Sequence, residues 1–261
     1  MDLNLSGKRA VVCGSTQGIG KAAAMELALL GACITLVARN EEKLKNVLLE
    51  LAANGGQKHD YIVVDFNLAE ELKIKAGAYA ASNTVHILIN NTGGPPAGLA
   101  IDADPEEFVR AFSNHLLCNQ ILTQAFVPGM KQAGYGRIIN VISTSVKAPI
   151  KGLGVSNTIR GAVASWAKTL SLELGQSGIT VNNVLPGATL TTRHELVINE
   201  ASKKTGKSVD QVRAEMLTQI PAGRFGDPRE TGAVIAFLCT PGAGYVNGIN
   251  VPVDGGRTSS L

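Results

Sequence analysis

The chain has 261 residues, of which 45% are hydrophobic and 17% are charged, so it can bury one large core and is not a disordered segment. Its formal net charge of +3 is small and no block of lysines or arginines stands out, so no polyanionic partner is implied. An aromatic content of only 4% argues further against a surface that stacks nucleic-acid bases.

Short apolar strands alternate with helical segments along the chain. The predicted strands cover residues 8–13, 33–38, 61–64, 86–90, 137–142, 180–185 and 250–253. The predicted helices cover residues 18–30, 41–54 with Asn40 as the cap, 68–81, 105–132, 155–174 and 194–219. Apolar strands separated by helices predict a parallel sheet that is covered on both faces.

Right-handed crossovers between parallel strands give a doubly wound α/β domain of Rossmann type, here with about seven strands in a mostly parallel sheet. The sequence contains no linker, internal repeat or low-complexity tract, so we expect one domain over residues 1–261. Because ligands of such domains bind at the carboxyl ends of the strands, candidate functional residues are expected just after each strand.

The segment CGSTQGIG, residues 13–20, follows the first strand and opens the first helix. Gly14, Gly18 and Gly20 let the backbone turn sharply and approach a pyrophosphate, while the N–H groups at the start of the helix face the anion. Between this strand and this helix, the glycine pattern predicts a dinucleotide site.

The second strand ends in Ala38-Arg39-Asn40. Folds that prefer NAD usually have a carboxylate here, which binds the 2′-hydroxyl of the ribose. The planar guanidinium of Arg39 suits a 2′-phosphate instead, so the sequence favours NADP(H) over NAD(H). The alternative is an exposed arginine ahead of an acidic helix start.

Five further motifs follow the glycine turn in order: Val64-Asp65-Phe66, Asn90-Asn91-Thr92-Gly93, Asn182 with Pro186-Gly187 and Thr191, Pro221 with Arg224-Phe225-Gly226, and Val253-Asp254-Gly255-Gly256. With these motifs the chain resembles the short-chain dehydrogenase/reductase family over almost its whole length, and within it the branch similar to 3-oxoacyl-acyl-carrier-protein reductase. Cys13 and Thr92 stand where the family usually has threonine and alanine.

The resemblance implies a bound NADP(H) or NAD(H), with Asp65 at the adenine and Thr191 at the nicotinamide amide. The predicted cofactor-binding residues are Gly14, Ser15, Thr16, Gln17, Gly18, Ile19, Gly20, Arg39, Asn40, Asp65, Phe66, Asn91, Thr92, Gly93, Pro186, Gly187 and Thr191.

The resemblance also implies a catalytic tetrad of Asn, Ser, Tyr and Lys, in which Tyr transfers the proton, Lys lowers the pKa of Tyr and Ser orients the substrate. Ser143, which follows the strand at 137–142, matches the family serine. The tyrosine position falls on Ser156 and the lysine position on Arg160. The asparagine position falls on His115, so one of the four residues is retained.

These departures predict an altered proton relay. The hydroxyl of Ser156 is a far weaker acid than a phenol, and Arg160 does not give up its proton, although it can hold ribose hydroxyls and supply positive potential. Two residues are candidates for the missing proton donor: His115, because histidine side chains titrate near neutral pH, and Lys147, in the loop after Ser143. The alternative for His115 is a structural histidine, hydrogen-bonded in a helix kink. The alternative for Lys147 is a lysine that is only solvated at the surface of its loop.

The predicted helix at residues 194–219 is rich in charged residues and lies in an excursion near residues 190–220. The resemblance implies that this region is a substrate lid. In relatives, the helices that correspond to residues 105–132 and 155–174 build a tetramer. We therefore expect a homo-tetramer or a dimer, with a hetero-oligomer with a paralogue as the alternative.

The four cysteines show no C-x-x-C pair and the four histidines no ligand spacing, so neither a disulfide framework nor a metal site is expected. The first residues lack the apolar core of a signal peptide, and no apolar run approaches the length of a membrane span. We therefore expect a cytoplasmic protein with no membrane or nucleic-acid partner.

Two functions remain. The first is an NADP(H)-dependent oxidoreductase that acts on a carbonyl or secondary alcohol, with His115, Lys147 or a water chain moving the proton. The second is a non-catalytic family member that binds the cofactor or scaffolds an oligomer with an active paralogue. The intact glycine turn favours the enzyme, whereas the loss of the family's Tyr and Lys favours the second function.

Overall fold

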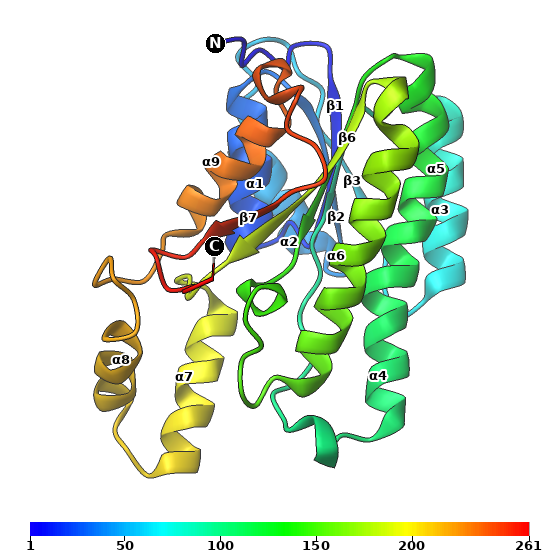
Figure 1. Ribbon diagram of the computed structural model, residues 1–261. Helices are drawn as coiled ribbons and strands as arrows, with labels where there is room; N and C mark the ends of the chain where they lie inside the picture. Colours follow the sequence, from blue (N-terminus) through cyan, green and yellow to red (C-terminus); the bar gives the residue numbers. More distant parts are fainter. Residues whose placement is uncertain (261) are drawn as a thin grey trace.

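A computed structural model describes residues 1–260, and its centre is a parallel sheet of seven strands in the order β3-β2-β1-β4-β5-β6-β7 (Figure 1). The strands are β1 (Arg9–Cys13), β2 (Cys33–Ala38), β3 (Asp60–Val63), β4 (Ile87–Asn90), β5 (Gly136–Val141), β6 (Ile179–Pro186) and β7 (Asn250–Val253). Every neighbouring pair is parallel. The order reverses between β1 and β4, as in a doubly wound fold, so the predicted fold class is confirmed.

Helices connect the strands and cover both faces of the sheet. Their bounds are α1 (Gly18–Leu29), α2 (Glu41–Glu50), α3 (Ala69–Ser82), α4 (Pro105–Phe112), α5 (Cys118–Gln132), α6 (Gly154–Leu174), α7 (Thr192–Thr205), α8 (Val209–Leu217) and α9 (Pro228–Leu238). Asn40 caps α2 as predicted, because its side chain accepts a hydrogen bond from the Lys43 N–H at 2.8 Å. The helix ends at Glu50 rather than at residue 54.

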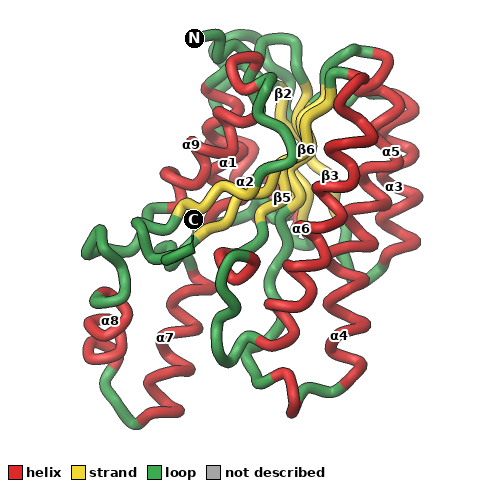
Figure 2. Tube along the Cα trace, viewed as in Figure 1, coloured by secondary structure: helices red, strands yellow, loops and turns green. Residues whose placement is uncertain are grey.

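Two apolar layers form the core, one on each face of the sheet. Helices α1, α2 and α9 lie on one face, and α3, α5 and α6 lie on the other (Figure 2). Successive strand residues alternate between the layers: Val12 packs in the first layer and Val11 and Cys13 in the second. The strands are apolar throughout because both of their faces are buried.

Helix α9 was not among the predicted helices. It begins with a capping box, in which Asp227 and Glu230 each accept a hydrogen bond from the backbone N–H of the other. It packs so closely on α1 that a Cβ added to Gly232 would lie 2.9 Å from the backbone of Ala22. The signal of Asp227, Pro228 and Glu230 ahead of an apolar run was present in the sequence.

The segment 105–132, predicted as one helix, is interrupted. Residues Ser113–Leu117 form a π-helical turn between α4 and α5. The extra residue of such a turn changes the direction in which the side chains point, and π turns are frequent at functional sites. His115 lies within this turn and is buried.

A row of asparagine side chains crosses the sheet from β4 to β7. Asn90 donates to Asn140 at 2.9 Å, Asn140 donates to Asn183 at 2.9 Å, and Asn183 donates to Asn250 at 2.8 Å. Consecutive members are paired in the strand register, so the four amides form one ladder. We refer to these four residues as the asparagine ladder.

Helices α7 and α8 extend away from the sheet at the edge that is formed by the carboxyl ends of the strands (Figure 1). They occupy the excursion predicted near residues 190–220. None of the helices in residues 1–260 has the length and apolarity that crossing a bilayer requires. In the same residues, no cluster of three or more His, Cys, Asp or Glu suits a metal ion.

Candidate cofactor and active site

The turn between β1 and α1 is packed against the segment after β4. Gly14 has a φ of +60°, and a Cβ at this position would lie 2.5 Å from the carbonyl oxygen of Asn91. At Gly20 a Cβ would lie 2.3 Å from the carbonyl oxygen of Gly14. The side chain of Asn91 donates to the carbonyls of Cys13 and Gly14, both at 3.3 Å. Glycine is therefore required here by the close approach of the backbones.

The start of α1 is suited to an anion. No side chain caps the helix, and its first turn has no acidic residue, so its N–H groups and dipole face outwards uncompensated. Thr191, which follows β6, lies beside this turn, since its Cγ2 would be 3.2 Å from a Cβ on Gly18. Backbone N–H groups between two strand ends fit the pyrophosphate of a dinucleotide.

Side chains of the glycine turn differ in their accessibility. The Ser15 side chain is fully buried and accepts a hydrogen bond from the Val37 N–H at 3.0 Å, so it ties the turn to β2. Gln17 is exposed, and Thr16 and Ile19 are half-buried.

The ends of β2 and β3 bring Arg39 and Asp65 together. The guanidinium of Arg39 lies 3.6 Å from a carboxylate oxygen of Asp65, and the Arg39 side chain is 69% exposed. Asp65 also accepts two hydrogen bonds from Asn67, at 2.8 and 2.9 Å. The Phe66 carbonyl accepts from the Cys118 thiol at 3.3 Å. Arg39 can therefore move to meet a ligand, whereas Asp65 is held in place.

The segment after β6 connects the sheet to α7. Gly187 donates its N–H to the Val253 carbonyl at 2.9 Å. It lies so close to Asp254 that a Cβ on Gly187 would be 2.6 Å from the Cβ of Asp254. Thr191 caps α7, since its hydroxyl accepts from the His194 N–H at 3.2 Å. Its methyl group faces the glycine turn, as described above.

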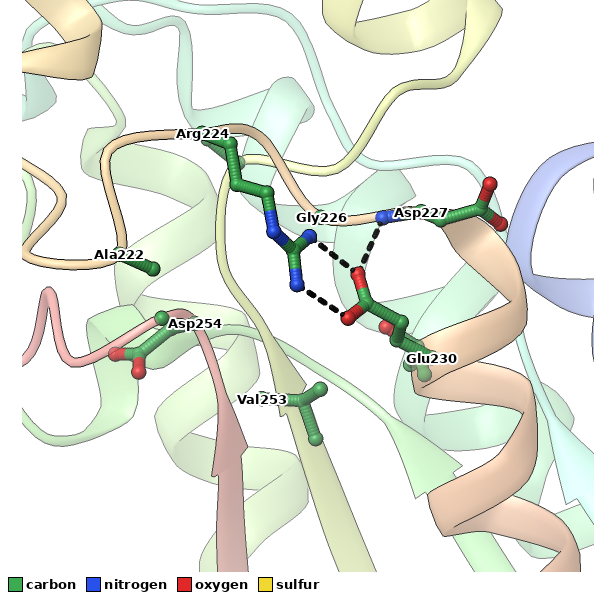
Figure 3. A pocket seen from close by; sticks show the side chains of 10 residues that line it. Ala222, Arg224, Gly226, Asp227, Glu230, Val253 and Asp254 are labelled. Atoms are coloured by element: carbon green, nitrogen blue, oxygen red, sulfur yellow. Dashed lines mark hydrogen bonds and ion pairs between the residues drawn. The ribbon is translucent and has the colours of Figure 1, made fainter.

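A small cavity of about 90 Å³ adjoins this segment (Figure 3). Arg224 donates to both carboxylate oxygens of Glu230, at 2.6 and 2.7 Å, and these bonds, with one from the Asp227 N–H, lower the pKa of Glu230 to about 2. Gly226, between them, exchanges backbone hydrogen bonds with the loop 188–190, at 2.8 and 2.9 Å. The cavity wall therefore holds the loop that carries Thr191.

Ser143 and Ser156 follow β5 in chain order. The Ser143 hydroxyl accepts from the Ser145 N–H at 3.1 Å, which leaves its proton available to a ligand. Ser156 lies in the first turn of α6, one turn before Arg160, and within residues 1–260 its hydroxyl makes no hydrogen bond. The two side chains therefore lie on the same face of α6.

Arg160 is buried at the ends of β4 and β5. Its guanidinium donates to the carbonyl of Val141 at 2.9 Å and to that of Thr92 at 3.4 Å. Burial, and next the charge of Arg193, lower the pKa of Arg160 to about 10, so it remains a cation at neutral pH. Sequence reasoning missed Arg193, because nothing in the sequence around it indicates that α7 brings it near Arg160.

His115 is uncharged at neutral pH. The residue is 2% exposed and its Nδ1 is hydrogen-bonded to the Thr92 hydroxyl. Burial, and next the charge of Arg160, lower the pKa of His115 to about 3. Its imidazole therefore carries no imidazolium proton to donate near pH 7. His115 is thus a buried, hydrogen-bonded histidine within a π-helical turn.

His115 is expected to make stability depend on pH. Its pKa is near 6.5 in the unfolded chain and about 3 when folded, so between these values the unfolded state binds the extra proton and stability falls as pH falls. From pH 7 to pH 5 the wild type should lose about 2 kcal/mol more than His115→Gln. Urea unfolding of the wild type and of His115→Gln at pH 7 and pH 5 measures this difference in stability. Titration of His86 and His194 cancels in the comparison, because both proteins contain these residues. An equal loss in both would contradict the buried neutral histidine.

The four tyrosines lie outside this site. Tyr61 donates to Glu41 at 3.0 Å, Tyr79 is hydrogen-bonded to Thr35, and Tyr135 donates to the Cys239 carbonyl at 2.5 Å. Tyr245 is fully exposed after α9. Lys147 is exposed in the turn that follows Ser143. Lys147 and Ser143 therefore share one loop, as their spacing predicts.

Comparisons with known proteins find relatives over almost the whole chain. The sequence model of the family described as "Enoyl-(Acyl carrier protein) reductase" matches residues 14–258. The chain is 32% identical over 256 residues to the 3-oxoacyl-[acyl-carrier-protein] reductase of Vibrio cholerae, which covers 97% of this chain and 98% of the relative. It is 31% identical over 259 residues to a tropinone reductase homolog of Arabidopsis thaliana, which covers 98% and 94%.

A solved structure also matches the fold over the whole chain. The L-sorbose reductase from Gluconobacter frateurii, complexed with NADPH and L-sorbose, superimposes with a TM-score of 0.93 at 30% identity. The match covers the whole of both chains.

Proposed function

Because the chain belongs to the short-chain dehydrogenase/reductase family of NAD(P)-dependent oxidoreductases, we propose that it transfers hydride between NADP(H) and a carbonyl or secondary alcohol. The observation that carries the proposal is the tight glycine turn with the uncapped start of α1, bordered by Thr191. This turn presents uncapped backbone N–H groups at the carboxyl end of β1, where a doubly wound fold binds the pyrophosphate of a dinucleotide.

The proposed proton relay differs from that of the family. Bound NADPH would supply the hydride to the carbonyl carbon. Ser143 donates a hydrogen bond to the substrate oxygen, and the buried cation Arg160 stabilises the negative charge that develops there. Because His115 is uncharged, the proton comes from Lys147 or through water, and His115 fixes Thr92.

Arg39 supports the preference for NADP(H). It is exposed at the end of β2 and free to swing from Asp65, which is itself held by Asn67. Its planar guanidinium can bind a 2′-phosphate with two hydrogen bonds, whereas the 2′-hydroxyl of NADH offers no charge.

Binding of NADPH and NADH, followed by a panel of carbonyl substrates, tests the proposal. Arg39→Ala should raise the Kd for NADPH by about 10- to 100-fold and change that for NADH by less than about 2-fold, as for a lost hydrogen bond to a charged group. Lys45→Ala is the matched control, because Lys45 lies on the adjacent helix and pairs with Glu41.

Three results would contradict parts of the proposal. Failure to bind either nucleotide removes the cofactor assignment. Equal affinity for both nucleotides removes the preference for NADP(H). Tight binding with no reduction of any carbonyl supports the non-catalytic alternative.

A further inference from the structure

Arg160 is a buried cation without an acidic partner. The residue is 8% exposed, and its guanidinium donates to two backbone carbonyls. No ion pair in residues 1–260 includes it. Buried charges are normally paired, because removing a charge from water is costly. An anionic ligand could supply the negative charge that the described part of the chain does not provide.

A second cation lies near the first. Arg193, in the first turn of α7, donates to the Pro95 carbonyl at 2.8 Å, while Arg160 donates to the Thr92 carbonyl of the same segment. The proximity is enough for Arg193 to lower the pKa of Arg160. Glu195, the nearest acid along α7, pairs with Arg213 instead. Two cations therefore border the segment 92–95 with their charges uncompensated in the described part of the chain.

The start of α6 adds to this positive potential. No side chain caps this 21-residue helix, and its first turn contains no acidic residue. The unpaired hydroxyl of Ser156 lies in that turn, on the same face as Arg160. An anion on this face would meet a guanidinium, a hydroxyl and the positive end of a helix together.

We propose that Arg160 and Arg193 bind a carboxylate of the substrate, so that the enzyme reduces oxo acids and oxidises hydroxy acids in preference to uncharged ketones and alcohols. The proposal rests on the function proposed above and names its substrate class. In reduction, the carbonyl carbon takes a hydride from NADPH and the oxygen takes a proton, which gives a hydroxy acid and NADP⁺. The carboxylate remains unchanged and serves for binding.

The phosphates of the cofactor are the other source of negative charge. Their site is the turn between β1 and α1, whereas Arg160 contacts carbonyls that follow β4 and end β5. Two of the five N–H groups of the guanidinium are used by these carbonyls, so others can bind a carboxylate. We therefore assign the two arginines to the substrate, and the experiment separates the two sources.

Matched pairs of acid and ester provide the test. Pyruvate, acetoacetate and levulinate place the carboxylate at increasing distance from the ketone, and their methyl esters remove only its charge. With the wild-type protein and NADPH, at least one acid should show a kcat/KM about 10- to 100-fold above that of its ester, as expected for hydrogen bonds to a charged group. The preference should decrease as salt is raised.

Substitution of each arginine by methionine tests whether Arg160 and Arg193 bind the carboxylate. Arg160→Met should abolish the preference for the acid, so that acid and ester are reduced with the same kcat/KM, and should leave the Kd for NADPH unchanged. Both kcat/KM values should fall together, because Arg160 also stabilises the charge that develops on the carbonyl oxygen. Arg193→Met, an exposed position that is safe for folding, should reduce the same preference by a smaller factor. Arg229→Met, at an exposed position on α9, is the matched control and should change nothing.

The outcomes separate this inference from the proposed function. Esters reduced as well as acids would overturn the inference and leave the oxidoreductase intact. A rise in the Kd for NADPH in Arg160→Met, with the acid preference retained, would assign the cation to the cofactor and overturn it too. If no compound is reduced, a thermal shift of the NADP⁺ complex by the acids but not by the esters would support the carboxylate site and contradict the proposed function. Absence of that shift would overturn the inference.

Discussion

Replacement of Asn140 by alanine is expected to lower the free energy of unfolding by about 2–6 kcal/mol, measured by urea denaturation. Asn140 is fully buried and is an inner member of the asparagine ladder, where it accepts from Asn90 and donates to Asn183. Alanine would leave a buried donor on Asn90 and a buried acceptor on Asn183 without partners, and each such group costs about 1–3 kcal/mol.

Position in the ladder provides the control. Asn250 is half-buried at the far end and makes one ladder bond, so Asn250→Ala leaves only the donor of Asn183 unpaired. Its cost should be about half that of Asn140→Ala, and smaller still if water reaches Asn183. Equal costs at the two positions would show that the ladder does not act through buried unpaired groups.

The ladder also shows what the sequence could and could not reveal. Each of the predicted strands at 86–90, 137–142 and 180–185 contains an asparagine, and so does the strand at 250–253. Their apolar neighbours sufficed to predict the strands, because burial of both faces leaves a continuous apolar pattern. That the four amides meet depends on the strand order and register, which local pattern does not determine.

The glycine turn was the more predictable part of the candidate site. Gly14 and Gly20 follow a strand directly, and their spacing reflects a backbone requirement that only glycine meets. The state of His115 was not predictable in this way. Its low pKa follows from burial in a π-helical turn and from the charge of Arg160, which is 45 positions away in the chain. Arg193 is a further example, since only the path of α7 brings it near Arg160.

Ser156→Tyr is expected to raise kcat for carbonyl reduction by about 100-fold, within the range for general acid catalysis. The phenol would stand one helical turn before Arg160, on the same face of α6. A neighbouring buried cation favours the phenolate and lowers the pKa of the phenol from its ordinary value near 10. A group of this kind can give a proton to the developing alkoxide, which the serine hydroxyl cannot do.

The control for this gain is Ser156→Phe, which has the same ring without the hydroxyl. It should leave kcat at or below the wild-type value, and the pH dependence of kcat should show a new ionisation in the tyrosine variant alone. Equal rates in the tyrosine and phenylalanine variants would mean that proton transfer does not limit turnover. In that case an efficient proton relay through Lys147 or water would compensate for the absence of the family's tyrosine. The small side chain of Ser156 would then serve to leave space for the substrate.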